Sequence, residues 1–285
     1  MELVSSHKHF GGRTNYYTHE SRVCNHKMNF SVYLPPASEM RKLPVLYFLS
    51  GLTCNEEIFM TEAQAQAHAK KYEVIIVVPD TSPRDTGIVG ENDSYDLGSG
   101  AGFYVDATEA KWAKHYQMYS YVTRELREMV EAVLPIDTTK RGIFGHSMGG
   151  HGALVLGMRN PDLFQSISAF APICAPSLGP WGQKAFTAYL GSDQSTWAKY
   201  DANSLVKKMS AGEIAKAAPV LIDQGLDDEF LAAELYLDTF DASASAVDYP
   251  VTIRRHPEYD HSYYFISSFV ESHIAFHAKN FLTVS

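Results

Sequence analysis

Short apolar runs alternate along the chain with segments whose apolar residues recur at helical spacing. The runs at 45–49 and 74–78 are rich in Val, Ile and Leu, and each lies beside a proline. They are too short for buried helices, and strands covered on both faces read as continuous apolar runs, so both predict buried parallel strands. The segment 57–71 between them is rich in Ala, Gln and Glu and predicts a helix.

The same alternation continues to the end of the chain. An alternating run at 29–34, ended by two prolines, predicts an early strand. We expect further strands at 141–144, 166–170, 220–223 and 251–255, and helices at 116–134, 148–159, 229–240 and 262–279. This order predicts one α/β domain over residues 1–285, with a mostly parallel central sheet and helices on both faces.

Two long segments depart from this alternation. Residues 80–110 are glycine-rich, and residues 172–203 hold several prolines and tryptophans, among them Trp181. Long loops in a compact domain usually carry function, and both segments follow expected strands. We therefore expect the two loops to roof a site.

One segment ties this pattern to chemistry. Residues 142–153, GIFGHSMGGHGA, read as an apolar strand, then Gly-x-Ser-x-Gly, then a helix of small residues. That order is typical of the nucleophile elbow of the α/β-hydrolase fold. Gly145 and Gly149 are needed because the sharp turn leaves no room for side chains two residues to either side of Ser147. Ser147 is the candidate nucleophile.

A serine hydroxyl needs a base to remove its proton and an acid to orient the base. In this fold the acid follows the serine in the chain, and the histidine follows the acid. Asp228 lies in a turn between an expected strand and helix and is our candidate acid, with Asp227 as the alternative. His261 precedes the closing helix and is the candidate base, with His256 as the alternative.

The tetrahedral intermediate of acyl transfer needs two main-chain amide donors. One is the amide after the nucleophile, that of Met148, and the other comes from the turn after the 45–49 strand, where we choose Leu52. His273 and His277 are four residues apart on the last helix but lack the context of a metal motif, so we interpret them as surface or satisfied core residues.

Composition narrows the setting. The net charge of −9 argues against a nucleic-acid or anionic-membrane partner. Three widely spaced cysteines do not form a disulfide pattern and fit a reducing compartment. The N-terminus has no apolar run, and no stretch approaches 18 apolar residues, so we expect no signal peptide, no membrane span and a cytoplasmic location.

Taken together, these motifs resemble the S-formylglutathione hydrolase (esterase D) family. The matching pieces are SGLTC at 50–54, GHSMGGHG at 145–152, GQKAF at 182–186, DQG at 223–225 with Asp228 and Phe230, and YDHSYYF at 259–265. The resemblance runs from about residue 12 to residue 280. It implies hydrolysis of S-formylglutathione to glutathione and formate, the second step of glutathione-dependent formaldehyde detoxification.

The resemblance also implies side activity on short acyl esters, frequent homodimers, and neither a metal nor an organic cofactor. It makes Ser147 the nucleophile, Asp228 the orienting acid and His261 the base. Cys54 matches a thiol near the family's active site, against its reading as a small buried apolar residue. Trp112, Lys114 and Trp181 are candidates for the pocket wall.

The bulky Trp and Tyr residues of the two long segments suggest a tight acyl pocket that selects formyl groups. Two other functions stay open at this point. One is a general short-chain carboxylesterase with the same triad. The other is a catalytically inactive fold that serves as a binding module, against which the intact set of serine, acid and histidine argues.

Overall fold

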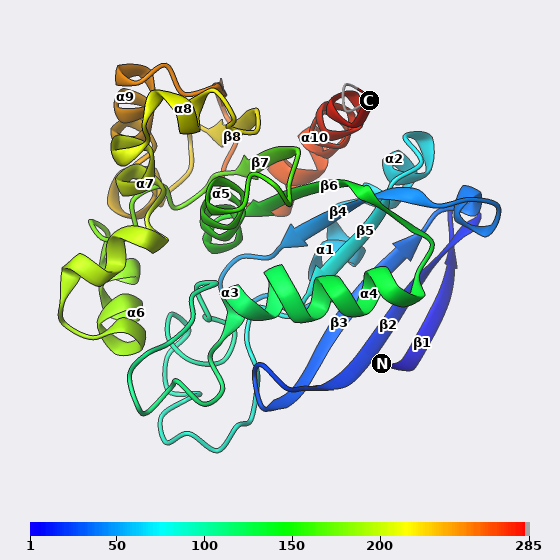
Figure 1. Ribbon diagram of the computed structural model, residues 1–285, viewed down its shortest axis with the longest axis horizontal. Coiled ribbons are helices and arrows are strands. Elements are labelled where there is room, and N and C mark those ends of the chain that lie inside the picture. The colour runs from blue at the N-terminus through cyan, green and yellow to red at the C-terminus, as the bar shows by residue number, and fades with distance from the viewer. Residues whose placement is uncertain (283–285) are drawn as a thin grey trace.

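One sheet organises the part of the chain that the computed structural model describes, residues 1–282 (Figure 1). Within these residues nine strands pair in the order β1-β2-β3-β5-β4-β6-β7-β8-β9. Their bounds are β1 (Glu2–His9), β2 (Gly12–Ser21), β3 (His26–Leu34), β4 (Leu43–Leu49), β5 (Ile75–Pro79), β6 (Ile136–His146), β7 (Ser166–Phe170), β8 (Val220–Gly225) and β9 (Val251–His256).

The sheet is mostly parallel, as the sequence predicts. The ladder from β5 through β4, β6, β7 and β8 to β9 is parallel throughout. The strands β1, β2 and β3 extend it antiparallel from the β5 side. The strands β1 and β2 were not expected, because their residues are largely polar and β1 is almost wholly exposed, so no apolar run marks them.

Helices cover both faces of the sheet. The α-helices of the described residues are α1 (Ile58–Glu62), α2 (Ala65–Lys71), α3 (Met118–Ser120), α4 (Arg127–Val133), α5 (Met148–Arg159), α6 (Pro180–Leu190), α7 (Ala202–Lys208), α8 (Ala211–Ile214), α9 (Leu237–Ala246) and α10 (Tyr263–Leu282). Four further turns of 3-10 or π helix are η1 (Pro36–Glu39), η2 (Tyr121–Leu126), η3 (Gln194–Tyr200) and η4 (Leu231–Leu235).

In Figure 1, α4 and α5 lie in front of the sheet and α10 lies behind it. Neighbouring residues of β6 show why both faces are apolar. A Cβ on Gly157 of α5 would touch Ile143, whereas the ring of Phe144 lies 5.6 Å from that of His277 on α10. Because successive side chains of a strand point to opposite faces, β6 is buried on both sides over residues 142–146.

Three expectations need correction. Residues 172–203 are not a loop, since they contain α6 and η3, and Pro180 begins α6 at its first turn, where a missing amide hydrogen costs nothing. The helix expected at 57–71 is divided at Gln64, and the one at 229–240 at Tyr236. Both residues adopt a left-handed backbone, which ends one helical segment and starts the next.

The segment 80–116 between β5 and α3 lacks long regular elements but is packed rather than loose. Its Phe103 and Tyr104 are buried, and Tyr104 donates a hydrogen bond of 2.9 Å to the carbonyl of Ser50. The segment is thereby fixed to the turn that follows β4. Among the described residues, no helix has the length and apolar character needed to cross a bilayer.

Candidate active site

Ser147 sits at a sharp turn between β6 and α5. Its backbone angles, φ 56° and ψ −118°, are strained for a residue with a side chain. A Cβ on Gly149 would overlap the carbonyl of Leu49, and one on Gly145 would overlap the carbonyl of Gly149. Both glycines are therefore required by the close approach of β4 to the turn.

The loop after β8 and the loop before α10 are joined by main-chain hydrogen bonds. The amide of Leu226 donates to the carbonyl of His256 at 2.9 Å, and the amide of Asp227 donates to the carbonyl of Tyr259 at 2.9 Å. A Cβ on Gly225 would overlap the Tyr259 carbonyl, so the two loops can approach this closely only with glycine there. The pairing sets the distance between the candidate acid and the candidate base.

Asp228 and His261 meet across these loops. Nδ1 of His261 lies 2.6 Å from Oδ2 of Asp228, whose side chain is fully buried. An ionised carboxylate only accepts hydrogen bonds, so Nδ1 carries the hydrogen and Nε2 is left as the basic nitrogen. The amide of Phe230 donates to the other carboxylate oxygen, Oδ1, at 2.8 Å.

The structure does not bring the two alternative residues into this arrangement. Asp227 is exposed and lines a separate groove beside His261. Nε2 of His256 lies 3.3 Å from the carboxylate of Asp223 rather than near the nucleophile.

Ser147 and His261 line one pocket of about 200 Å³ at the carboxyl edge of the sheet. The lining residues are Gly51, Leu52, Thr53, Cys54, Tyr95, His146, Ser147, Trp181, Phe230 and His261. Within residues 1–282 the Ser147 hydroxyl makes no hydrogen bond, so its contact with the imidazole has still to close. Catalytic hydrogen bonds of this kind are often long before substrate binds.

The candidate oxyanion donors lie beside the nucleophile. Met148 is the first residue of α5, and the amides of a first helical turn have no acceptor within their helix. The turn that carries Leu52 packs on the nucleophile, since a Cβ on Gly51 would lie 3.2 Å from Cβ of Ser147. The positive end of the α5 dipole also favours a negative charge here.

The pocket wall differs in part from the expected one. Cys54 and Trp181 line it, whereas Trp112 is buried against Tyr189 with ring centroids 5.2 Å apart, and Lys114 is exposed outside the lining. Both expectations were wrong because aromatic and basic residues of a long segment can equally serve its own packing and its solvated face.

Sequence reasoning missed Tyr95 and Phe230 as wall residues. Nε1 of Trp181 donates to the Tyr95 hydroxyl at 2.9 Å, and its ring lies 4.8 Å from that of Phe230. Three segments far apart in the chain thus build one aromatic wall. No local motif marks Tyr95, although Phe230 lies within the quoted resemblance.

Two neutral groups complete the surroundings of the nucleophile. Burial, with the nearby His261, holds the pKa of the His146 imidazole well below its usual range, so this ring stays uncharged. Its ring centroid lies 4.5 Å from that of His261. Burial also raises the pKa of the Cys54 thiol, against the opposing effect of Arg84, so the thiol is protonated at neutral pH.

A second serine, histidine and aspartate lie together in the core but do not form a catalytic centre. Oγ of Ser168 lies 2.8 Å from Nδ1 of His273, whose Nε2 lies 3.2 Å from Asp223. All three side chains are fully buried, and none of them lines any of the described pockets. His277 likewise bonds Ser168 at 2.9 Å, so His273 and His277 are hydrogen-bonded core residues.

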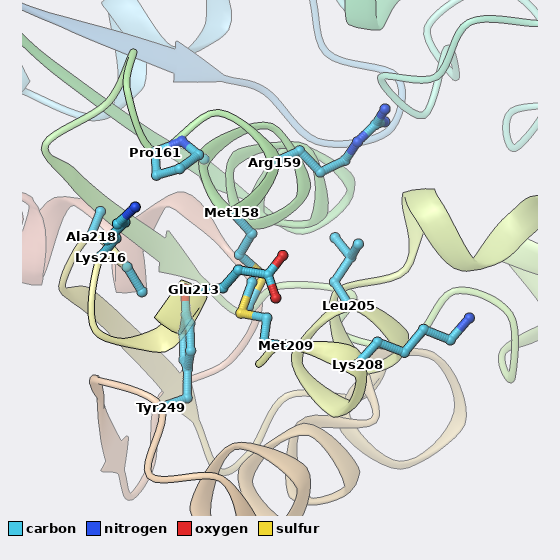
Figure 2. A pocket seen from close by; sticks show the side chains of 12 residues that line it. Met158, Arg159, Pro161, Leu205, Lys208, Met209, Glu213, Lys216, Ala218 and Tyr249 are labelled. Carbon is cyan, nitrogen blue, oxygen red and sulfur yellow. The ribbon is translucent and has the colours of Figure 1, made fainter. Parts of the chain in front are cut away.

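Larger cavities lie away from this chemistry. Figure 2 shows one of about 430 Å³ at the far end of α5, beside α7 and α8, with Met158, Met209 and Tyr249 among its lining residues. None of the candidate catalytic residues lines it. Within the described residues, no group of three or more His, Cys, Asp or Glu side chains is arranged to hold a metal ion.

Comparison with known proteins places the chain among esterases. A model of the Esterase family, described as "Putative esterase", matches residues 21–276. Curated proteins named S-formylglutathione hydrolase from Rattus norvegicus and Mus musculus are 51% identical over 282 residues and 50% identical over 280. The matches cover 98% of this chain in both cases, and 99% and 98% of the respective relatives.

Solved structures agree with this placement. An S-formylglutathione hydrolase from Agrobacterium tumefaciens superposes with a TM-score of 0.94 at 42% identity, covering 99% of this chain and 100% of that one. A ferulic acid esterase superposes with a TM-score of 0.74 at 20% identity, covering 95% of this chain and 99% of that one, and shows a shared fold.

Proposed function

This chain belongs to the esterase family that includes the S-formylglutathione hydrolases, and we propose that it hydrolyses S-formylglutathione to glutathione and formate. The chain is a hydrolase of the α/β-hydrolase fold. One observation carries the proposal of a Ser-His-Asp mechanism: Nδ1 of His261 lies 2.6 Å from Oδ2 of Asp228, and His261 shares a small pocket with Ser147.

In the first half of the proposed reaction, Nε2 of His261 takes the proton of the Ser147 hydroxyl as its oxygen attacks the thioester carbonyl. The resulting oxyanion accepts hydrogen bonds from the amides of Met148 and Leu52. The C–S bond then breaks, and the imidazolium returns its proton to the departing sulfur. The products of this half are glutathione and a formyl ester on Ser147.

In the second half, water enters the position that the thiol has left. His261 takes one proton from this water, and the hydroxide attacks the formyl carbonyl. The ester bond to Ser147 breaks, the imidazolium protonates the serine oxygen, and formic acid leaves and releases its remaining proton to water as formate. Asp228 holds the ring and stabilises its charged form in both halves.

The size of the pocket supports a small acyl group. A volume of about 200 Å³ lies below the usual range for small-molecule sites, and the aromatic side chains of Tyr95, Trp181 and Phe230 bound it. A formyl group carries hydrogen where longer acids carry carbon, so a short acyl chamber selects it by excluding the others.

The test compares kcat/KM for S-formylglutathione, S-acetylglutathione and a series of p-nitrophenyl esters of rising acyl length. We expect the formyl thioester to lead and turnover to fall steeply beyond acetyl. Long acyl esters turning over as well as formyl and acetyl substrates would overturn the acyl-selection argument. Ser147→Ala retaining full thioester turnover would overturn the serine mechanism, whereas a parent protein that turns over none of these substrates would favour the binding-module alternative.

A general short-chain carboxylesterase is the second candidate, and one observation favours it. The ten lining residues include no lysine or arginine to bind the two glutathione carboxylates. Equal kcat/KM for p-nitrophenyl acetate and S-formylglutathione would support this alternative over the first.

We propose the wider setting on the same basis. The resemblance to the family supports a place in glutathione-dependent formaldehyde detoxification and assembly as a homodimer. The three cysteines form no disulfide, which supports a reducing, cytoplasmic location. Size-exclusion chromatography with light scattering tests the dimer, and loss of formaldehyde tolerance on deleting the gene tests the pathway.

A further inference from the structure

We propose that Gln224 is a positioning residue of the catalytic centre, acting on His261 through Asp228. Gln224 lies near the end of β8, four residues before Asp228, and its side chain is fully buried. Its Nε2 donates to Oδ2 of Asp228 at 3.0 Å and to the carbonyl of Gly225 at 2.9 Å. This inference rests on the triad in the proposed function.

The chemistry of the neighbours fixes the orientation of this amide. Both partners, a carboxylate oxygen and a peptide carbonyl, only accept hydrogen bonds, so the NH₂ group and not the amide oxygen must face them. The amide oxygen, Oε1, is buried and has no hydrogen-bond partner within the described residues. A buried polar atom left unpaired is costly, and the side chain bears that cost to keep its donor on Asp228.

Asp228 is thus held at both of its oxygens. Oδ1 accepts from the amide of Phe230 at 2.8 Å, and Oδ2 accepts from both Gln224 and His261. The donors from Phe230 and Gln224 together fix the plane of the carboxylate independently of the imidazole. Without Gln224, Oδ2 would accept a hydrogen bond from His261 alone, so the carboxylate could follow the imidazole when the ring moves instead of holding it in place.

Gln224 also affects the charge that the imidazole experiences. The Asp228 side chain has no contact with solvent, so its negative charge is stabilised by the few protein donors that reach it. Removing one donor concentrates that charge on the atom that faces His261. The carboxylate then attracts the hydrogen on Nδ1 of the imidazole more strongly.

The test uses Gln224→Met, which keeps the length of the side chain and removes the donor. Kinetics are measured on p-nitrophenyl acetate from pH 5 to 9, so failure of the S-formylglutathione proposal would leave this test intact. We expect kcat to fall roughly 10-fold or more with KM within about twofold, because the interaction serves the transition state. We also expect the acid limb of the kcat/KM profile to move to higher pH.

Gln66 offers a matched control. It is also a fully buried glutamine, its Nε2 donates to the carbonyl of Met60, and its Oε1 is also without a partner. Gln66→Met makes the same chemical change away from the pocket, so we expect its thermal stability to fall while kcat and the pH profile stay those of the parent. Matching kcat and pH profiles in the two variants would overturn the proposal.

Gln224→Glu keeps the proposal testable if Gln224→Met fails to fold. A neutral carboxyl group can donate to Asp228, whereas an ionised one cannot and repels it. Burial beside a carboxylate favours the neutral form, so this variant should keep most activity at the low end of the profile and lose it progressively as pH rises. An activity ratio to the parent that does not change with pH would refute the role of the donor.

Discussion

Replacing Asp228 by asparagine tests the central dyad with almost no change in shape. The carboxylate accepts from three donors, Nδ1 of His261 and Nε2 of Gln224 at one oxygen and the amide of Phe230 at the other. Asparagine has one oxygen to offer, so its NH₂ group must face either the Phe230 amide or the other two donors.

The second orientation is the one we expect. The Phe230 amide belongs to the main chain and cannot turn away, whereas His261 can change tautomer and Gln224 keeps its hydrogen bond to the Gly225 carbonyl. In that orientation Nδ1 of His261 accepts a hydrogen bond and Nε2 carries the hydrogen. Nε2, the nitrogen proposed as the base, then cannot accept a proton from Ser147, although the ring has not moved.

A wrong tautomer in this kind of triad costs about 10⁴-fold in kcat, equivalent to about 5.4 kcal/mol. We expect a loss of that order in p-nitrophenyl acetate turnover, with the melting temperature lowered by only a few degrees. Asp227→Asn is the matched control, because Asp227 is exposed and is the neighbouring acid in the sequence. A loss below tenfold in Asp228→Asn, or an equal loss in Asp227→Asn, would refute the assignment.

Three further predictions follow from the same contacts. Gly149→Ala places a methyl group against the Leu49 carbonyl, so we expect a melting temperature several degrees lower and impaired turnover. Gly212→Ala, at a position with open space around it, should leave both unchanged, and a fully active, stable Gly149→Ala protein would contradict this reasoning. Bulky maleimides should inhibit the enzyme by reacting with Cys54, and the reaction should become faster as pH rises because burial raises the pKa of this thiol. Cys54→Ser should resist them, and equal inhibition of both proteins would disprove Cys54 as the site of reaction. Burial alone would raise the pKa of Asp223, but the basic groups around it hold that pKa well below its usual range, so the ionised carboxylate stabilises the fold above about pH 4 and this stabilisation is lost as pH falls further. The difference in unfolding free energy between the parent and Asp223→Asn, measured by urea titration, should therefore narrow below about pH 4. A difference that does not change with pH would refute this.

The sequence predicts those parts of the fold whose cause is local. The turn at Ser147 follows from Gly145 and Gly149, which the main chain of β4 requires, and the helix expected at 148–159 has the bounds of α5. The sequence predicts the loops of the candidate acid and base because each lies between a strand and a helix in the order that this fold demands.

The rest depends on contacts between distant segments. Tyr95 is joined to the pocket wall by a hydrogen bond from the indole of Trp181 to the Tyr95 hydroxyl. Trp181 lies in α6, which the sequence did not predict because of the prolines around it. Trp112 has the same composition signal as Trp181, yet its ring packs inward on Tyr189. The edge strand β1 owes its conformation to pairing with β2 rather than to any apolar run.

The main-chain hydrogen bonds that join the loop after β8 to the loop before α10 constrain the backbone of these loops but not the identity of their side chains. Leu226 and Asp227 contribute only their main-chain amides to these hydrogen bonds, and both residues are exposed. Their side chains can therefore change in evolution while the spacing of Asp228 and His261 stays the same. Proline is the exception, since it alone lacks the amide hydrogen that these main-chain hydrogen bonds require.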